Sequence, residues 1–241
     1  MLKEFSKNAK ILLCIISFSL IFGCNKTDEK KVGANSSEDK ISSVVNNVSQ
    51  QLEQIMSSDT IGIQREYFEK KYGPAKRSFG NIWRYEIGAC LVNIEYDQKN
   101  SINSVELENI SKECNFNGKN INLTSMADKI NYAELIDVAM EWNAKLSCYT
   151  MCGNAADPEY GAYIQTPRVY GFIEFDATTN YSEAADASDK VKEYFKKKYP
   201  NIDLIGDELG TIPKEEYNKI WFEKFKNIKL TAIKFGYNLK K

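Results

Sequence analysis

The sequence predicts an α+β fold, in which a short helix and a three-stranded antiparallel meander are followed by a second α+β unit. Two patterns carry this prediction. Apolar residues alternate with polar ones in three short runs at 82–87, 90–96 and 102–107, and they recur at helical spacing in runs before and after these. The composition, 43% hydrophobic and 27% charged over 241 residues, is that of an ordinary globular protein.

The first predicted helix spans 41–56 and is amphipathic, because its apolar residues repeat at helical spacing between Asn, Gln and Ser. These apolar residues are Ile41, Val44, Val45, Val48, Leu52, Ile55 and Met56. We expect this stripe to pack on its own domain, and binding to another protein is the alternative. A shorter helix is predicted over 64–72. Gly73-Pro74 ends it, since glycine adopts the left-handed cap and proline cannot continue a helix.

The three predicted strands each carry one apolar face. The residues of these faces are Trp83, Tyr85 and Ile87 in the first strand, Val92, Ile94 and Tyr96 in the second, and Val105 and Leu107 in the third. The alternation predicts that Trp83, Tyr85 and Tyr96 lie in the core. The same three aromatic side chains are also the candidate interaction face, because aromatic residues are enriched at protein interfaces.

The C-terminal half, 115–241, is predicted to form the second α+β unit. Its elements are helices at 132–147, 182–199 and 212–225, strands at 168–177 and 228–239, and a turn-rich loop over 153–161. Two strands are too few to fix an architecture. They either form a separate sheet or pack onto the first one.

The N-terminus has the features of an export signal. Lys3, Lys7 and Lys10 precede an apolar run over 11–22, which is shorter than the ~20 residues that a membrane-spanning helix needs. The sequence Ile21-Phe22-Gly23-Cys24 then resembles the lipobox of bacterial lipoproteins, although Phe22 is larger than the residue usual at its position. A plain secretory signal or a short membrane anchor are the alternatives.

The lipobox resemblance implies that residues 1–23 are removed and that Cys24 carries the lipid that anchors the protein to a membrane. Residues 24–40 are almost all polar or charged, so we expect a flexible tether. By the same resemblance, Asn25 favours the outer membrane of a Gram-negative cell envelope, on the face toward the periplasm.

Four cysteines remain in the mature chain after Cys14 and Cys24 are set aside, and an exported chain permits disulfides. Three pairings are open. We favour Cys90–Cys114, because these residues lie at neighbouring ends of two adjacent antiparallel strands. That leaves Cys148 with Cys152. A four-thiolate zinc site and a redox-active dithiol are the competing interpretations of the same residues.

Residues 60–108 resemble the SmpA/OmlA family of envelope lipoproteins. The resemblance rests on Ile61-Gly62-Ile63, Tyr72-Gly73-Pro74, Trp83-x-Tyr85 and Val92-x-Ile94-x-Tyr96-Asp97, followed by Val105. It implies one domain over 41–114 that combines the amphipathic helix with the meander, and a role in outer-membrane assembly or maintenance. The region 115–241 has no counterpart in this family pattern.

The composition argues against several classes of function. Histidine is absent, which excludes Ser-His-Asp and Cys-His nucleophiles and His-ligated zinc. The 32 basic and 33 acidic residues give no excess of positive charge for binding nucleic acid. Carboxylates occur in two groups, which are Asp157 with Glu159, and Asp176 with Glu183, Asp186 and Asp189. We interpret both groups as surface or helix-terminal charges and expect no cofactor, no metal and no enzymatic activity.

The functional prediction is therefore a lipid-anchored, non-enzymatic envelope protein that binds a protein partner. An inhibitor or immunity lipoprotein that blocks an exported enzyme is the alternative. A carboxylate-dependent hydrolase is a third hypothesis, which would need Asp157, Glu159 or Asp176 for activity.

Overall fold

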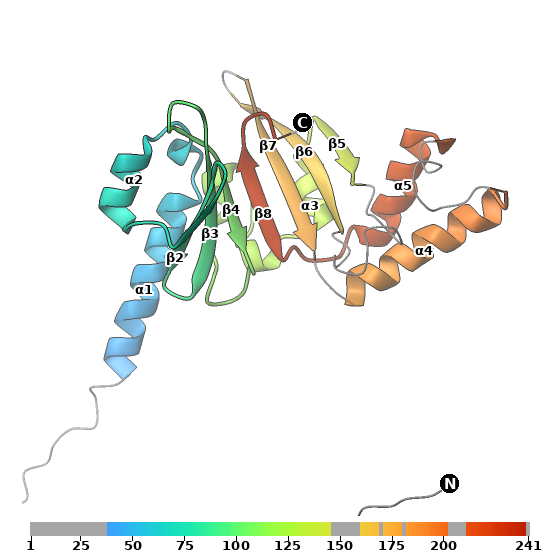
Figure 1. Ribbon diagram of the computed structural model, residues 1–241. Helices are drawn as coiled ribbons and strands as arrows, with labels where there is room; N and C mark the ends of the chain where they lie inside the picture. The colour runs from blue at the N-terminus through green and yellow to red at the C-terminus, as the bar shows by residue number, and fades with distance from the viewer. Residues whose placement is uncertain (1–37, 146–159, 169–170, 180–181, 202–210, 240–241) are drawn as a thin grey trace, which may run out of the picture. The chain divides into compact units, whose positions relative to one another are not determined.

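The computed structural model describes residues 38–145, 160–168, 171–179, 182–201 and 211–239. The described strands form an antiparallel eight-stranded sheet in the order β1-β2-β3-β4-β8-β7-β6-β5 (Figure 1). The mixed helix and sheet content agrees with the predicted fold class. The predicted three-stranded meander is present as β2-β3-β4, but it is only part of a larger sheet.

The elements of the first half follow the predicted ranges closely. They are α1 (Glu38–Ile55), α2 (Arg65–Tyr72), β1 (Arg77–Phe79), β2 (Ile82–Ile87), β3 (Cys90–Tyr96) and β4 (Ile102–Glu108), with a short 3-10 turn, η1 (Ser58–Thr60), between the helices. Gly73 ends α2 as expected and has a positive φ of 88°, but its ψ of 171° lies outside the left-handed helical conformation that was predicted. β1 was not predicted, because three exposed residues carry no alternation.

The elements of the second half are η2 (Gly118–Ile121), η3 (Ala127–Lys129), α3 (Tyr132–Asp137), β5 (Glu141–Ala144), β6 (Tyr160–Arg168), β7 (Gly171–Thr179), α4 (Ser182–Lys198), α5 (Lys214–Phe225) and β8 (Ala232–Gly236). The helices α4 and α5 and the final strand were predicted. Among the described residues, no helix is long and apolar enough to cross a membrane.

The helix predicted over 132–147 is confirmed to Asp137 and wrong over the following described residues, 138–145. The Met140 amide bonds to the carbonyl of Gln165 (2.8 Å) instead of continuing the helix, and β5 begins at the next residue. Trp142 is then opposite Ile164 of β6, on the apolar face of the sheet. Strand pairing thus packs the partly buried Trp142 indole against the core without the remaining predicted helical turns.

The strand predicted over 168–177 is confirmed from Gly171 onward as part of β7, whereas its first residue, Arg168, ends β6. Residues 169 and 170 lie outside the described chain. β6 begins at Tyr160, inside the predicted loop 153–161, whose residues 153–159 lie outside the described chain. β6 escaped prediction because Tyr163, Gln165 and Pro167 occupy its outer positions, and proline in particular argues against a strand.

β8 joins the two halves of the sheet. It pairs with β4 on one side, where Phe235 is opposite Val105, and with β7 on the other, where it is opposite Phe175. The strands before and after the boundary expected between 114 and 115 therefore belong to one continuous sheet. β8 thus links the β2-β3-β4 meander to the strands of the second half by backbone hydrogen bonds on both of its edges.

The two faces of the sheet differ sharply in polarity. One face carries a row of apolar cross-strand partners, which runs Trp83, Ile94, Val105, Phe235, Phe175, Ile164 and Trp142. Trp221 and Phe222 of α5 contact Trp142, which puts α5 on this face. Leu52 and Ile55 of α1 belong to the same buried cluster. This face holds the hydrophobic core.

We predict that Phe235→Ala destabilises both halves of the sheet together. The ring is fully buried, and its removal leaves a cavity, so the free energy of unfolding should fall by about 3 to 5 kcal/mol. Urea unfolding followed by tryptophan fluorescence and by circular dichroism should show one transition, shifted to lower urea.

The matched control is Phe79→Ala, because this ring is 67% exposed and its loss should cost less than about 0.5 kcal/mol. Two separate transitions, of which Phe235→Ala shifts only one, would contradict the joining role of β8.

Candidate functional site

The candidate interaction face Trp83, Tyr85 and Tyr96 is largely inside the protein. Tyr85 and Tyr96 are 1% and 3% exposed, and their hydroxyl groups lie 2.8 Å apart in a hydrogen bond. Their burial supports the interpretation as core residues and corrects the proposal of an interaction face, because a buried ring cannot reach a partner. Trp83 is half-buried and packs edge-on against Tyr96.

These aromatic residues position α2. The Tyr85 hydroxyl donates to Glu69 (3.2 Å), and the Arg65 Nε donates to the same carboxylate oxygen (3.0 Å). The Arg65 guanidinium also lies 3.5 Å from the centre of the Trp83 ring, as a cation–π pair. Burial raises the pKa of the Tyr96 hydroxyl to about 12, and burial also raises the pKa of Tyr85. Both phenols therefore stay neutral donors at physiological pH.

A groove of about 480 Å³ runs between α2, the end of α1 and η2. Its lining comprises Glu53, Gln54, Ser57, Asp59, Thr60, Ile63, Tyr67, Phe68, Lys71, Tyr72 and Asn120. Tyr67 is 64% exposed and Ile63 38% exposed, so both side chains present apolar surface at the groove. The groove is within the size range of ligand-binding pockets, about 300–1,000 Å³.

Hydrogen bonds hold the three walls of the groove together. Asn120 of η2 donates its Nδ2 to the carbonyl of Glu53 at the end of α1 (3.0 Å). The Tyr72 hydroxyl of α2 donates to the side chain of Gln54 (3.3 Å), and the Thr60 hydroxyl donates to the backbone carbonyl of Gln54 (2.9 Å). Because each wall is tied to α1, the groove exists before any ligand binds.

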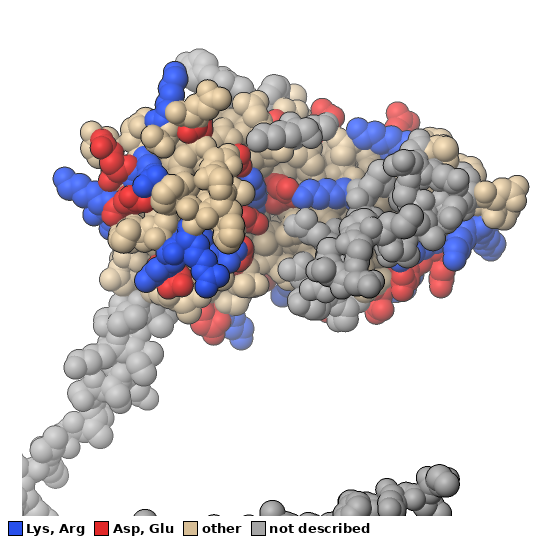
Figure 2. All heavy atoms as spheres, viewed as in Figure 1, with Lys and Arg blue, Asp and Glu red and all other residues tan. Residues whose placement is uncertain are grey.

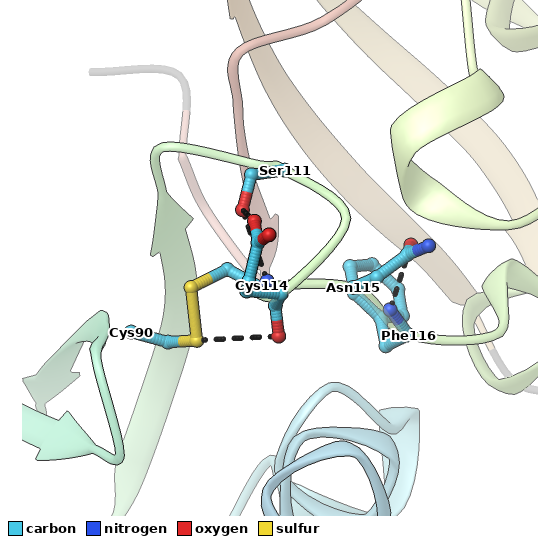
Figure 3. Close-up of a disulfide and its surroundings, with 6 residues drawn as sticks. Cys90, Ser111, Cys114, Asn115 and Phe116 are labelled. Atoms are coloured by element: carbon cyan, nitrogen blue, oxygen red, sulfur yellow. Dashed lines mark hydrogen bonds between the residues drawn. A yellow bond between two sulfur atoms is a disulfide. The ribbon is translucent and has the colours of Figure 1, made fainter. Parts of the chain in front are cut away.

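A disulfide supports the η2 wall. Cys90 opens β3 and is bonded to Cys114, in the segment between β4 and η2, with the two Cα atoms 5.4 Å apart (Figure 3). The Cys114 amide donates to Ser111 Oγ (3.0 Å), and the next residue, Asn115, accepts the Phe116 amide (3.0 Å). The Cys90–Cys114 disulfide is the pairing that the sequence predicted. Cys24, Cys148 and Cys152 lie outside the described residues.

The second face of the sheet is polar. Its central row of cross-strand partners runs Arg84, Asn93, Glu106, Lys234, Asp176, Tyr163 and Asn143. Lys234 Nζ donates to Glu95 (2.9 Å), Arg84 pairs with Glu108, and Lys145 pairs with Asp176. In the view of Figure 2, basic and acidic side chains are interspersed over the described surface. The charges of this face are thus matched mostly with one another.

Glu106 lies on this face without a salt bridge to any cation among the described residues. Burial raises the pKa of its carboxyl above the ordinary 4.5. The Asn93 Nδ2, which donates to Glu106 (3.0 Å), and the charge of Lys234 oppose this rise, whereas Glu108 and Asp176 add to it. The ionised form of Glu106 is therefore destabilised in the fold.

The described carboxylates among those singled out in the sequence are distributed over β7 and α4. Asp176 is paired with Lys145 on β7, whereas Asp189 on α4 is paired with Lys192 (3.2 Å). Glu183 and Asp186 also lie on α4, and Asp157 and Glu159 lie outside the described residues. Within the described ranges, no three Asp, Glu or Cys side chains are arranged to hold a metal ion.

Sequence reasoning missed the groove and the pair that supports it. The spacing of Arg65 and Glu69, four residues apart on a short predicted helix, is a signal for an ion pair. Tyr67 on the same helix belongs to neither the ion pair nor the apolar side formed by Phe68 and Tyr72. An aromatic residue in that position is a signal for a contact with something outside the domain.

Comparisons with known proteins do not identify the chain. No protein family model matches it, and no curated protein matches it. A solved structure of a DUF4309 family protein (YjgB) from Bacillus subtilis is similar to this chain. The alignment covers 58% of this chain and 89% of the YjgB chain. The identity is 8% and the TM-score 0.32, and a likeness at that level carries no argument about fold or function.

We predict that Glu106→Gln stabilises the protein increasingly as the pH rises. A carboxyl whose pKa is raised by folding contributes stability at pH below its unfolded value, and this contribution is lost as the pH rises through the folded value. Glutamine cannot ionise but still accepts a hydrogen bond from Asn93. Urea midpoints measured between pH 4 and pH 8 should therefore diverge, with the variant above the wild type at the high end.

Glu86→Gln is the control, because Glu86 is exposed on β2 and should show no such divergence. Parallel pH profiles for the wild type and Glu106→Gln would contradict the destabilised carboxylate.

Proposed function

We propose that the chain is a lipid-anchored lipoprotein of the bacterial cell envelope, whose folded body is a non-enzymatic module that binds a protein partner in outer-membrane assembly or maintenance. The observation that carries the proposal is the open groove at the C-terminal end of α1, with exposed aromatic surface and walls fixed by hydrogen bonds. The sequence Ile21-Phe22-Gly23-Cys24 supports the anchor, and Asn25 with the SmpA/OmlA resemblance supports the location.

The length of α1 supports a partner that lies away from the anchored membrane. The helix begins at Glu38, within the last three residues of the predicted tether 24–40, and its last turn carries Glu53 and Gln54 into the groove. Its 18 residues span about 27 Å at 1.5 Å per residue. A protein held by Cys24 would therefore offer the groove to the periplasm.

The groove itself supports binding in preference to chemistry. Tyr67 and Ile63 expose apolar surface at its mouth, while hydrogen bonds to α1 fix its walls. A pre-formed site loses little conformational entropy when a partner binds. Anchoring would also favour binding, because confinement at one membrane raises the effective concentration of a partner on the same membrane.

We predict that Cys24→Ser releases the protein from the membrane. Several acyl chains, at ~0.8 kcal/mol per buried methylene, would hold the wild type on the bilayer, and serine cannot form the thioether. Membrane fractionation should move the protein from the pellet to the soluble fraction, and mass spectrometry should find lipid on the wild type alone. Cys14→Ser is the control and should leave the protein in the pellet. An unacylated Cys24→Ser protein that stays membrane-bound would refute the anchor.

Site-specific photocrosslinking in living cells tests the partner. A benzoylphenylalanine residue replaces Tyr67 in the groove or, as control, Glu193 on the exposed side of α4. The proposal expects a crosslinked envelope protein at the first position only, and a component of the barrel-assembly machinery would identify the process. Adducts that are the same at both positions would count against the groove. A single exported enzyme, held in equimolar amounts, would replace the proposal with the inhibitor function.

A further inference from the structure

The groove has an excess of acidic groups. Glu53 at the end of α1 and Asp59 in η1 contribute two carboxylates, and Lys71 of α2 contributes one ammonium group. In the part of the chain that the structure describes, no lysine or arginine forms a salt bridge with Glu53 or Asp59. Both carboxylates thus retain their capacity to accept hydrogen bonds from a ligand.

The aromatic walls of the groove also suit a cation. Tyr67 and Tyr72 both line it, and Tyr67 is 64% exposed. The chain's own Lys71 ammonium already lies 5.0 Å from the centre of the Tyr72 ring. The face of an aromatic ring attracts cations through its quadrupole, so Lys71 shows that such a contact forms at this wall.

Arg65, next to the groove, shows how an arginine side chain of this protein binds an aromatic ring and a carboxylate together. Arg65 stacks over Trp83 while its Nε donates to the carboxylate of Glu69. A planar guanidinium can stack on a ring and bond to a carboxylate at the same time, which an ammonium does less well. The groove offers the same two kinds of partner, an aromatic ring and a carboxylate, and no arginine is among its lining residues.

We propose that the groove binds a basic side chain, preferably arginine, from an exposed segment of the partner protein. This inference rests on the proposed function and names the chemistry of the partner. The side chain enters along Tyr67, and its charge is neutralised by Asp59 and Glu53. A cavity of about 480 Å³ accommodates one or two side chains rather than a folded surface, so the occupant is an anchoring residue on a loop or terminus.

The test uses the full lipidated chain in detergent and two short fluorescein-labelled peptides. The peptides are identical except that the central residue is arginine in one and glutamine in the other. Fluorescence anisotropy should show that the arginine peptide binds at least about tenfold more tightly, and that added salt weakens its binding. Tyr67→Ala and Asp59→Asn should each weaken binding of the arginine peptide by about five- to tenfold.

Two matched variants control for non-specific effects. Phe79→Ala removes a ring that is as exposed as Tyr67 but lies outside the groove, and Glu193→Gln removes an exposed carboxylate on α4. Both should bind the arginine peptide as the wild type does. The urea midpoint of every variant is measured alongside, and the fold should be retained because all four side chains are exposed.

Equal binding of the two peptides, or no binding of either, would overturn the basic-residue inference. An equal loss of affinity for the arginine peptide in Tyr67→Ala and Phe79→Ala would overturn the inference as well. These results leave the proposed function standing if photocrosslinking at Tyr67 still captures an envelope protein, because that experiment makes no assumption about charge. Loss of the crosslink would instead count against the proposed function.

Discussion

The pairing of β8 with two strands at once is the interaction on which the rest of the structure depends. Ile233 and Phe235 are fully buried between the two halves, and the backbone of β8 bonds to β4 and to β7. The approach to β4 is so close that a Cβ on Gly236 would lie 2.3 Å from the carbonyl oxygen of Asn103. Only glycine fits there, so one residue without a side chain permits the sheet to be continuous.

The groove depends on a second, smaller set of contacts that begins in this sheet. Tyr85 projects from β2 to Glu69, and Glu69 in turn fixes Arg65, so α2 has one orientation relative to the strands. That orientation leaves Tyr67 facing away from the core. The core of the meander therefore determines the shape of the groove, even though its buried tyrosines never touch a ligand. Substitutions in the core would alter binding indirectly, through the angle of α2.

Local patterns predicted β2, β3 and β4 because apolar and polar residues alternate over most of each strand, which ends at glycine or a polar turn. They failed for 132–147, where Leu135, Ile136 and Ala139 suit a helix equally well and only pairing with β6 favours a strand at Trp142. The order of the sheet could not be predicted, since β8 pairs with strands far away along the chain. The groove was missed because it forms only when α1, η1 and α2 fold back on one another and Asn120 joins them from farther along the chain.

The strand order also has a kinetic consequence. Until β8 arrives, β4 and β7 each have an edge of unpaired amide and carbonyl groups, which are templates for other strands. The contacts that close these edges are distant along the chain, and such topologies fold slowly. An early state with β2, β3 and β4 in place would carry a long unprotected edge during this time. The slow step and the aggregation-prone surface thus coincide, and a chaperone that masks the β4 edge would raise the yield of folded protein.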